Sequence, residues 1–80
     1  MASRSEISKW YDEGVEKGSA YMCIACDTFD YTYYPVYSSS IDEAKRFSRS
    51  PGEMQRVKEV YNLKSDKQGQ MNARRAWAIT

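Results

Sequence analysis

The sequence predicts an α+β fold: a helix, an antiparallel β-hairpin, and then two to three helices packed on a small sheet. An amphipathic stripe follows a helix-start signal near the N-terminus, two β-forming runs follow, and the remaining residues carry repeated helix-start signals. The chain has 80 residues, of which 41% are apolar and 29% charged. We therefore expect one globular domain, residues 1–80, with a modest core.

The first helix is predicted from its start, its stripe and its end. Ser3 and Glu6 have the spacing of a capping box. A cation and a glycine at Lys17 and Gly18 favour a helix end there. The stripe between these signals has helical spacing and comprises Ile7, Trp10, Tyr11, Gly14 and Val15.

Residues 20–26 form a continuous apolar run that is too short for a typical helix, so we expect a central strand buried on both faces. Residues 27–30 are typical of a turn, and residues 31–37 continue as a second strand. Pro35 lacks an N–H for a ladder, which favours an edge strand or a bulge.

Three more helices are predicted from capping signals. Ser40 with Glu43 opens a short helix. Ser50, Pro51 and Glu53 occupy the N-cap, N1 and N3 positions of a helix expected to end near residue 62. This helix would turn four residues toward the core: Met54, Val57, Val60 and Tyr61.

The last helix is expected to begin at Ser65, which has capping-box spacing to Gln68, and to end near Trp77.

No stretch approaches the roughly 20 apolar residues that cross a bilayer, and the first residues lack the apolar run of a secretory signal. We therefore expect a cytoplasmic protein without a membrane partner. Two cysteines are too few for a disulfide framework, and a reducing compartment keeps them as thiols.

Cys23 and Cys26 lie three apart in a predicted strand, so their side chains point to opposite faces. The chain has no histidine and no further cysteine, whereas tetrahedral zinc needs four ligands. We interpret both as buried structural thiols, with redox activity and metal binding as the weaker alternatives, and we expect no metal and no cofactor.

Asp27 and Asp30 bracket the predicted turn and are interpreted as turn-forming residues, because a Ca²⁺ or Mg²⁺ site needs more oxygen ligands than this turn offers. The sequence has no histidine to act as a general base, no glycine-rich phosphate loop and no nucleophile elbow. We therefore predict that the protein is not an enzyme and has no catalytic residues.

The hairpin is rich in aromatic residues: six of the eleven aromatic side chains fall within residues 21–37. Tyrosine is enriched at interfaces, because it offers a large contact area and a polar tip. The alternative is that half of these rings cover the core. The predicted partner-binding residues are Asp27, Phe29, Asp30, Tyr31, Tyr33, Tyr34 and Tyr37.

Charge is divided unevenly along the chain. Residues 1–40 carry three Lys/Arg and six Asp/Glu (−3), and residues 41–80 carry nine and five (+4). A basic C-terminal half with aromatic neighbours is also typical of nucleic-acid binding, in which rings stack on bases and cations contact phosphates. The residues for this alternative are Arg56, Lys67, Arg74 and Arg75.

Four segments resemble uncharacterised small proteins of tailed bacteriophages and bacterial genomes: WYDEG at 10–14, CDTFDY at 26–31, YPVY at 34–37 and MQRVKEVY at 54–61. The resemblance implies a phage-like origin, the host cytoplasm as location, and no activity that could be transferred.

The leading hypothesis is a non-enzymatic protein-binding module that modulates a host process through its tyrosine-rich hairpin, with an unidentified host or phage protein as partner. Nucleic-acid binding through the basic helices is the alternative, and a nucleotide site formed between copies of the chain is a third. Self-association is a further expectation, because a small sheet with an exposed edge gains from a second copy.

Overall fold

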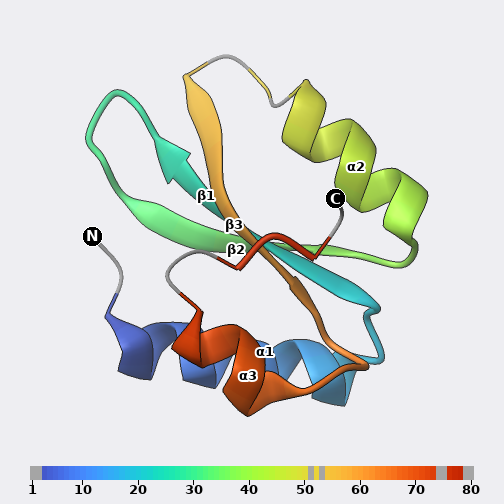
Figure 1. The fold of residues 1–80 in the computed structure, drawn as a ribbon. Helices are drawn as coiled ribbons and strands as arrows, with labels where there is room; N and C mark the ends of the chain where they lie inside the picture. Colours follow the sequence, from blue (N-terminus) through green and yellow to red (C-terminus); the bar gives the residue numbers. More distant parts are fainter. Residues whose placement is uncertain (1–2, 51, 53, 74–75, 79–80) are drawn as a thin grey trace.

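A computed structural model describes residues 3–50, 52, 54–73 and 76–78 and shows three helices around a three-stranded sheet (Figure 1). The strands are all antiparallel to their neighbours, in the order β2-β1-β3. This arrangement confirms the predicted α+β class. The elements are α1 (Arg4–Lys17), β1 (Tyr21–Asp27), β2 (Tyr33–Ser38), α2 (Ile41–Arg49), β3 (Gln55–Asn62) and α3 (Lys67–Asn72).

Helix α1 has the start and end that its sequence predicts. The Ser3 side chain accepts from the Glu6 backbone N–H, and the Glu6 side chain accepts from the Ser3 N–H, which completes the capping box. Gly18 ends the helix in the left-handed conformation, with φ 80°. The buried positions Ile7, Tyr11 and Gly14 recur every three to four residues and face the sheet.

Strand β1 is the central strand, as predicted. Five consecutive residues, 22–26, are buried, because a helical layer covers each face of the strand. Strand β2 is an edge strand that pairs only with β1 among the described strands, and its Pro35 lies opposite Ile24.

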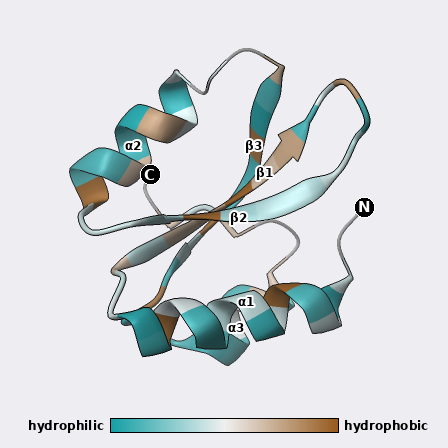
Figure 2. Ribbon diagram, turned by 180° about the vertical axis from the view of Figure 1, so that it is seen from behind, coloured by the Kyte–Doolittle hydropathy of each residue, from teal (hydrophilic) through white to brown (hydrophobic). Residues whose placement is uncertain are grey.

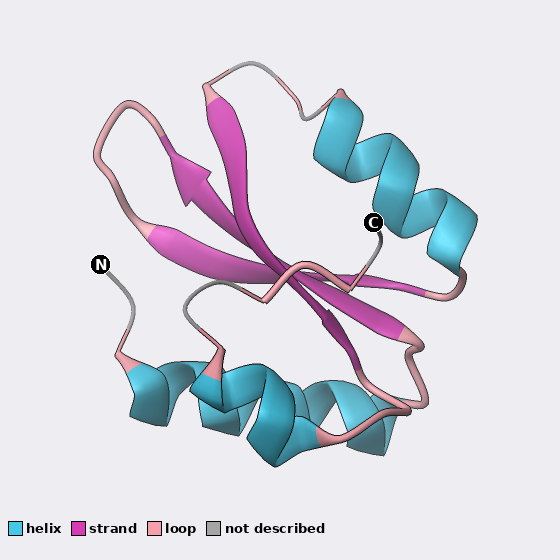
Figure 3. Cartoon of the chain, in the orientation of Figure 1, coloured by secondary structure: helices cyan, strands magenta, loops and turns pink. Residues whose placement is uncertain are grey.

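The two sheet faces carry separate core clusters. Figure 2 shows hydrophobic residues along the central strand β1, which lies between the helices. Helices α1 and α3 lie side by side over one face, and α2 lies over the other (Figures 1 and 3). The first cluster comprises Ile7, Tyr11, Met22, Ile24, Tyr61, Leu63 and Ala76. The second comprises Cys23, Ala44 and Val60.

The prediction of a helix over residues 50–62 is wrong, because residues 55–62 form strand β3. A β-bulge shifts the register between Ile24, which lies opposite Glu59, and Ala25, which lies opposite Val57. Strand β3 therefore has one extra residue here, and Val57 and Val60 share the α2 face although they are three apart. The bulge thus produces a spacing that imitates a helix. Tyr61 faces the other cluster.

The residues predicted to cap the start of this helix do not begin a helix in the part of the chain that the structure describes. Ser50 is the C-cap of α2, and Pro51 and Glu53 lie outside the described residues. Met54, predicted to be in the core, is 52% exposed.

The last helix is shorter than predicted and begins one residue later. Asp66, not Ser65, is the N-cap, since its carboxylate accepts from the Gly69 N–H at 3.0 Å. The chain then returns to the sheet, where Trp77 forms a parallel bridge with Val60. The bridge is held by Val60 N–H to Ala76 O (2.9 Å) and Ala78 N–H to Val60 O (3.0 Å).

The third strand gives the hairpin a neighbour within its own chain, and the C-terminal bridge extends the sheet beyond β3. The hairpin therefore does not need a second copy to gain a third strand. In the described part of the chain, none of the helices is both long and apolar enough to span a membrane.

Candidate functional site

The β1–β2 loop, residues 28–32, is built by two aspartates. Asp27 Oδ1 accepts from the Phe29 N–H at 2.8 Å, and Asp30 Oδ1 accepts from the Thr32 N–H at 3.0 Å. The hydrogen bonds from Thr32 hold the pKa of Asp30 below its usual value. Both carboxylates therefore act as turn formers, and the predicted second strand begins only at Tyr33.

The loop holds two aromatic side chains in solvent. Phe29 is 77% exposed and Tyr31 is 71% exposed. Across from them, the α2–β3 loop presents Met54, and the Thr28 N–H donates to the Met54 carbonyl at 2.7 Å. We call Phe29, Tyr31 and Met54 the tip patch. It lies at the end of the sheet that projects away from α1 and α3 (Figure 1).

The backbone of the tip patch is strained. Among the described residues, the non-glycine residues with a positive φ are Tyr31 (60°) and Met54 (59°). L-residues with side chains adopt this region at an energetic cost, and such strain concentrates at functional sites. Both strained residues belong to the exposed patch. Packing against a core therefore does not explain why these two positions hold tyrosine and methionine rather than glycine.

The other predicted hairpin residues are divided between the two sheet faces. Tyr37 packs on the α1 cluster, its hydroxyl donates to the Trp10 carbonyl at 2.8 Å, and burial raises its pKa. Tyr33 packs on the same cluster and has a pKa raised by burial. Tyr34 lies on the opposite face, where its hydroxyl accepts from Gln55 Nε2. Tyr37 therefore serves the core, as the alternative interpretation of the rings expects.

Next to the tip patch is a cleft of about 310 Å³ on the sheet face that α1 partly covers. Its two sides differ in chemistry. Tyr31 and Tyr33 line the β2 side, and Arg56 and Lys58 line the β3 side, with the buried Cys26 of β1 between them. We call this the tip cleft. Tyr31 belongs to both the patch and the cleft, so the two form one continuous surface.

The basic residues predicted for nucleic acid do not form one helical surface. Arg56 lies near the start of β3. Lys67 lies on α3, beyond the other end of that strand, and pairs with the Asp12 carboxylate at 2.9 Å. Six residues of strand between Arg56 and Asn62 alone span about 20 Å. Arg74 and Arg75 lie outside the described residues.

The two cysteines point to opposite faces of β1 and are both free thiols. Cys23 is fully buried, and burial raises its pKa to about 11. Such a thiol is unreactive near neutral pH, because the thiolate is the nucleophile. Within the described ranges, no three His, Cys, Asp or Glu side chains come together as a metal site.

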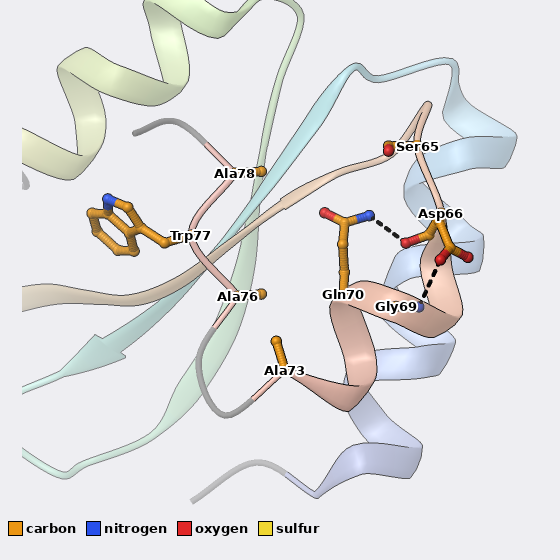
Figure 4. A pocket seen from close by; sticks show the side chains of 8 residues that line it. All are labelled: Ser65, Asp66, Gly69, Gln70, Ala73, Ala76, Trp77 and Ala78. Carbon is orange, nitrogen blue, oxygen red and sulfur yellow. Dashed lines mark hydrogen bonds between the residues drawn. The ribbon is translucent and has the colours of Figure 1, made fainter.

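A second hollow, of about 340 Å³, lies between α3 and the C-terminal bridge (Figure 4). The polar groups that line it hold the fold together: Gln70 Oε1 accepts from the Asn62 N–H at 2.7 Å, and its Nε2 donates to the Asn62 and Asp66 carbonyls. Apart from its polar residues, the lining consists of one glycine, three alanines and Trp77. This hollow offers a ligand little specific chemistry.

Sequence reasoning found Phe29, Tyr31 and Arg56, but it missed Met54 and Lys58. Both were assigned to a helix, Met54 on its buried side. The apolar residues of this segment, Val57, Val60 and Tyr61, have helical spacing, so its sequence carries no local signal that would have placed Met54 and Lys58 beside the hairpin.

Comparisons of the chain with known protein families, with curated proteins and with solved structures find no match. The resemblance to phage proteins stays a prediction.

Proposed function

We propose that this chain is a non-enzymatic protein-binding module that contacts its partner through the tip patch. The observation that carries the proposal is the exposure of Phe29, Tyr31 and Met54, each more than half exposed, on two loops joined by a backbone hydrogen bond. Clustered exposed apolar side chains are typical of interaction sites.

The scaffold behind the patch favours binding without a large ordering cost. The Asp27 and Asp30 side chains fix the hairpin loop, and the Thr28 N–H fixes the second loop to it. Preorganised loops lose less conformational entropy when a partner orders them. Covering an aromatic side chain that is otherwise in water contributes roughly 1.5–3 kcal/mol.

The proposal is tested by placing a photo-crosslinking amino acid at position 29 or 31 and irradiating bacterial cells that express the chain. The control carries the same amino acid at Val15, which is 49% exposed on α1. We expect a discrete crosslinked adduct from the tip positions and none from position 15. Equal adducts from all three positions, or an adduct from position 15 alone, would contradict the proposal.

Nucleic-acid binding is the second candidate, now favoured by the tip cleft rather than by the helices. Rings of Tyr31 and Tyr33 lie across from Arg56 and Lys58, the pairing of stacking surface and cation that single strands require. Binding of a single-stranded oligonucleotide should then weaken steeply with salt, as counterions are released. A flat salt response, or no binding at low salt, would remove this candidate.

A further inference from the structure

The charge of the tip cleft is set by its β3 side. Adjacent strands lie about 4.8 Å apart, so the β2 and β3 sides, separated by β1, are about 10 Å apart. Arg56 and Lys58 therefore line one side of a shallow cleft whose other side is aromatic. The cleft presents positive charge directly beside the apolar tip patch.

Three carboxylates of the described residues near the cleft, those of Asp27, Asp30 and Glu59, have partners of their own. Asp27 and Asp30 accept backbone N–H groups of the hairpin loop. Glu59 lies 3.7 Å from the Arg4 guanidinium and also accepts from the Tyr61 hydroxyl at 3.1 Å.

Arg56, in contrast, is exposed and forms no ion pair with any residue that the structure describes. Among the described residues, no carboxylate neutralises this arginine at the edge of the apolar patch.

We infer that the partner presents an acidic side chain beside an apolar anchor, with the anchor on the tip patch and the carboxylate on Arg56 in the tip cleft. This inference rests on the proposed protein-binding function and specifies the partner's chemistry. The guanidinium offers two parallel N–H donors that match the two oxygens of a carboxylate, and Lys58 adds a second positive charge on the same side.

An acidic peptide fits this surface better than a nucleic acid. A single strand carries a phosphate at every nucleotide and needs cations that follow the backbone. The cleft has two cations, and its neighbours are the apolar Phe29 and Met54 rather than further cations. Lys67, the next cation predicted for nucleic acid, is paired with Asp12 beyond the far end of β3.

The test uses a random peptide library displayed on phage and selected on the immobilised full chain, followed by affinity measurements on synthetic copies of the enriched peptides. We expect enriched sequences in which Asp or Glu lies near an aromatic or long aliphatic residue. Arg56→Gln should weaken their binding about fivefold to tenfold, and Arg56→Lys by less, because lysine keeps the charge but not the paired donors.

The matched control is Arg46→Gln, which removes an exposed arginine from α2 on the opposite sheet face. It should leave binding within about twofold. Far-UV circular dichroism and urea denaturation establish that each variant is folded.

The possible results distinguish a failure of the acidic-partner inference from a failure of the proposed protein-binding function. Enriched peptides that lack acidic residues, or that bind Arg56→Gln as well as the parent, overturn the inference but leave the proposed function standing if Phe29→Ser abolishes binding. No enrichment, or peptides that bind Phe29→Ser unchanged, overturns both. Tight salt-sensitive binding of oligothymidylate with no peptide enrichment would replace the acidic partner by a nucleic acid.

Discussion

Replacing Tyr31 by glycine should make the protein more stable while removing part of its contact surface. Tyr31 has φ 60°, a conformation that costs a residue with a side chain roughly 1–2 kcal/mol and costs glycine almost nothing. Its side chain is 71% exposed, so the substitution forfeits little burial. Glycine also makes the unfolded chain more flexible, so folding costs more conformational entropy. This cost offsets roughly 0.5–1 kcal/mol of the stabilisation.

The balance predicts that Tyr31→Gly stabilises the fold by about 0.5–1 kcal/mol. With a urea m-value of about 1 kcal/mol/M for a small protein, the midpoint of urea denaturation should rise by about 0.5–1 M. The matched control is Phe29→Gly, in the same loop and similarly exposed but without a positive φ, which should lower the midpoint. If both variants lower the urea midpoint equally, the positive φ of Tyr31 carries no such energetic cost. Backbone strain then no longer supports a functional role for the tip patch.

Three further results follow from the packing. Gly14→Val should destabilise the fold by about 1–3 kcal/mol in urea denaturation, because an added Cβ would lie 2.6 Å from Tyr37 Cε1; an unchanged midpoint would show that the helix can move off the sheet. Burial raises the pKa of Tyr61 to about 12, so the free energy of unfolding should fall as pH rises from 10 to 12, and Tyr61→Phe should flatten that decline. A thiol reagent such as Ellman's should label Cys23 and Cys26 only after urea is added, since both are at most 2% exposed; rapid labelling of the native protein would contradict their burial.

The folded protein binds the phenol proton of Tyr61 more tightly than the unfolded chain does. Its folded pKa lies above the usual value near 10, so the folded state keeps its proton over the interval in which the unfolded state loses it. The stabilisation is complete below pH 10 and is lost as pH rises through the folded pKa.

Local signals predicted the first half of the fold. The capping box at Ser3 and the glycine at Gly18 act within one helical turn, so their effect can be read from neighbouring residues. The run at residues 20–26 has a helical layer on each face, which leaves a continuous apolar pattern in the sequence.

Strand β3 could not be read in this way, because its pattern depends on pairing. Val57 and Val60 share a face only because β3 has one extra residue at the bulge opposite Ile24 and Ala25, and nothing in the sequence of residues 55–62 reports the bulge. A helix over this segment does not place Met54 and Lys58 beside the hairpin, whereas strand β3 does.

The tip surface was partly predictable. The aromatic density of residues 21–37 identifies the hairpin, but which ring is core and which is surface depends on helix α1, whose Trp10 carbonyl accepts from the Tyr37 hydroxyl. The separation of Tyr37 from Phe29 and Tyr31 is therefore a tertiary property.

The most direct test of the tip patch measures the affinity of one selected peptide for two double variants by fluorescence anisotropy. Phe29→Ser with Tyr31→Ser removes two exposed aromatic contacts, and Val15→Ser with Ile41→Ser removes two exposed apolar residues on α1 and α2. At about 1.5 kcal/mol per ring, the tip variant should lose about 100-fold in affinity, while the control stays within about twofold. Equal affinities for the two variants would contradict the assignment of the tip patch as the contact surface.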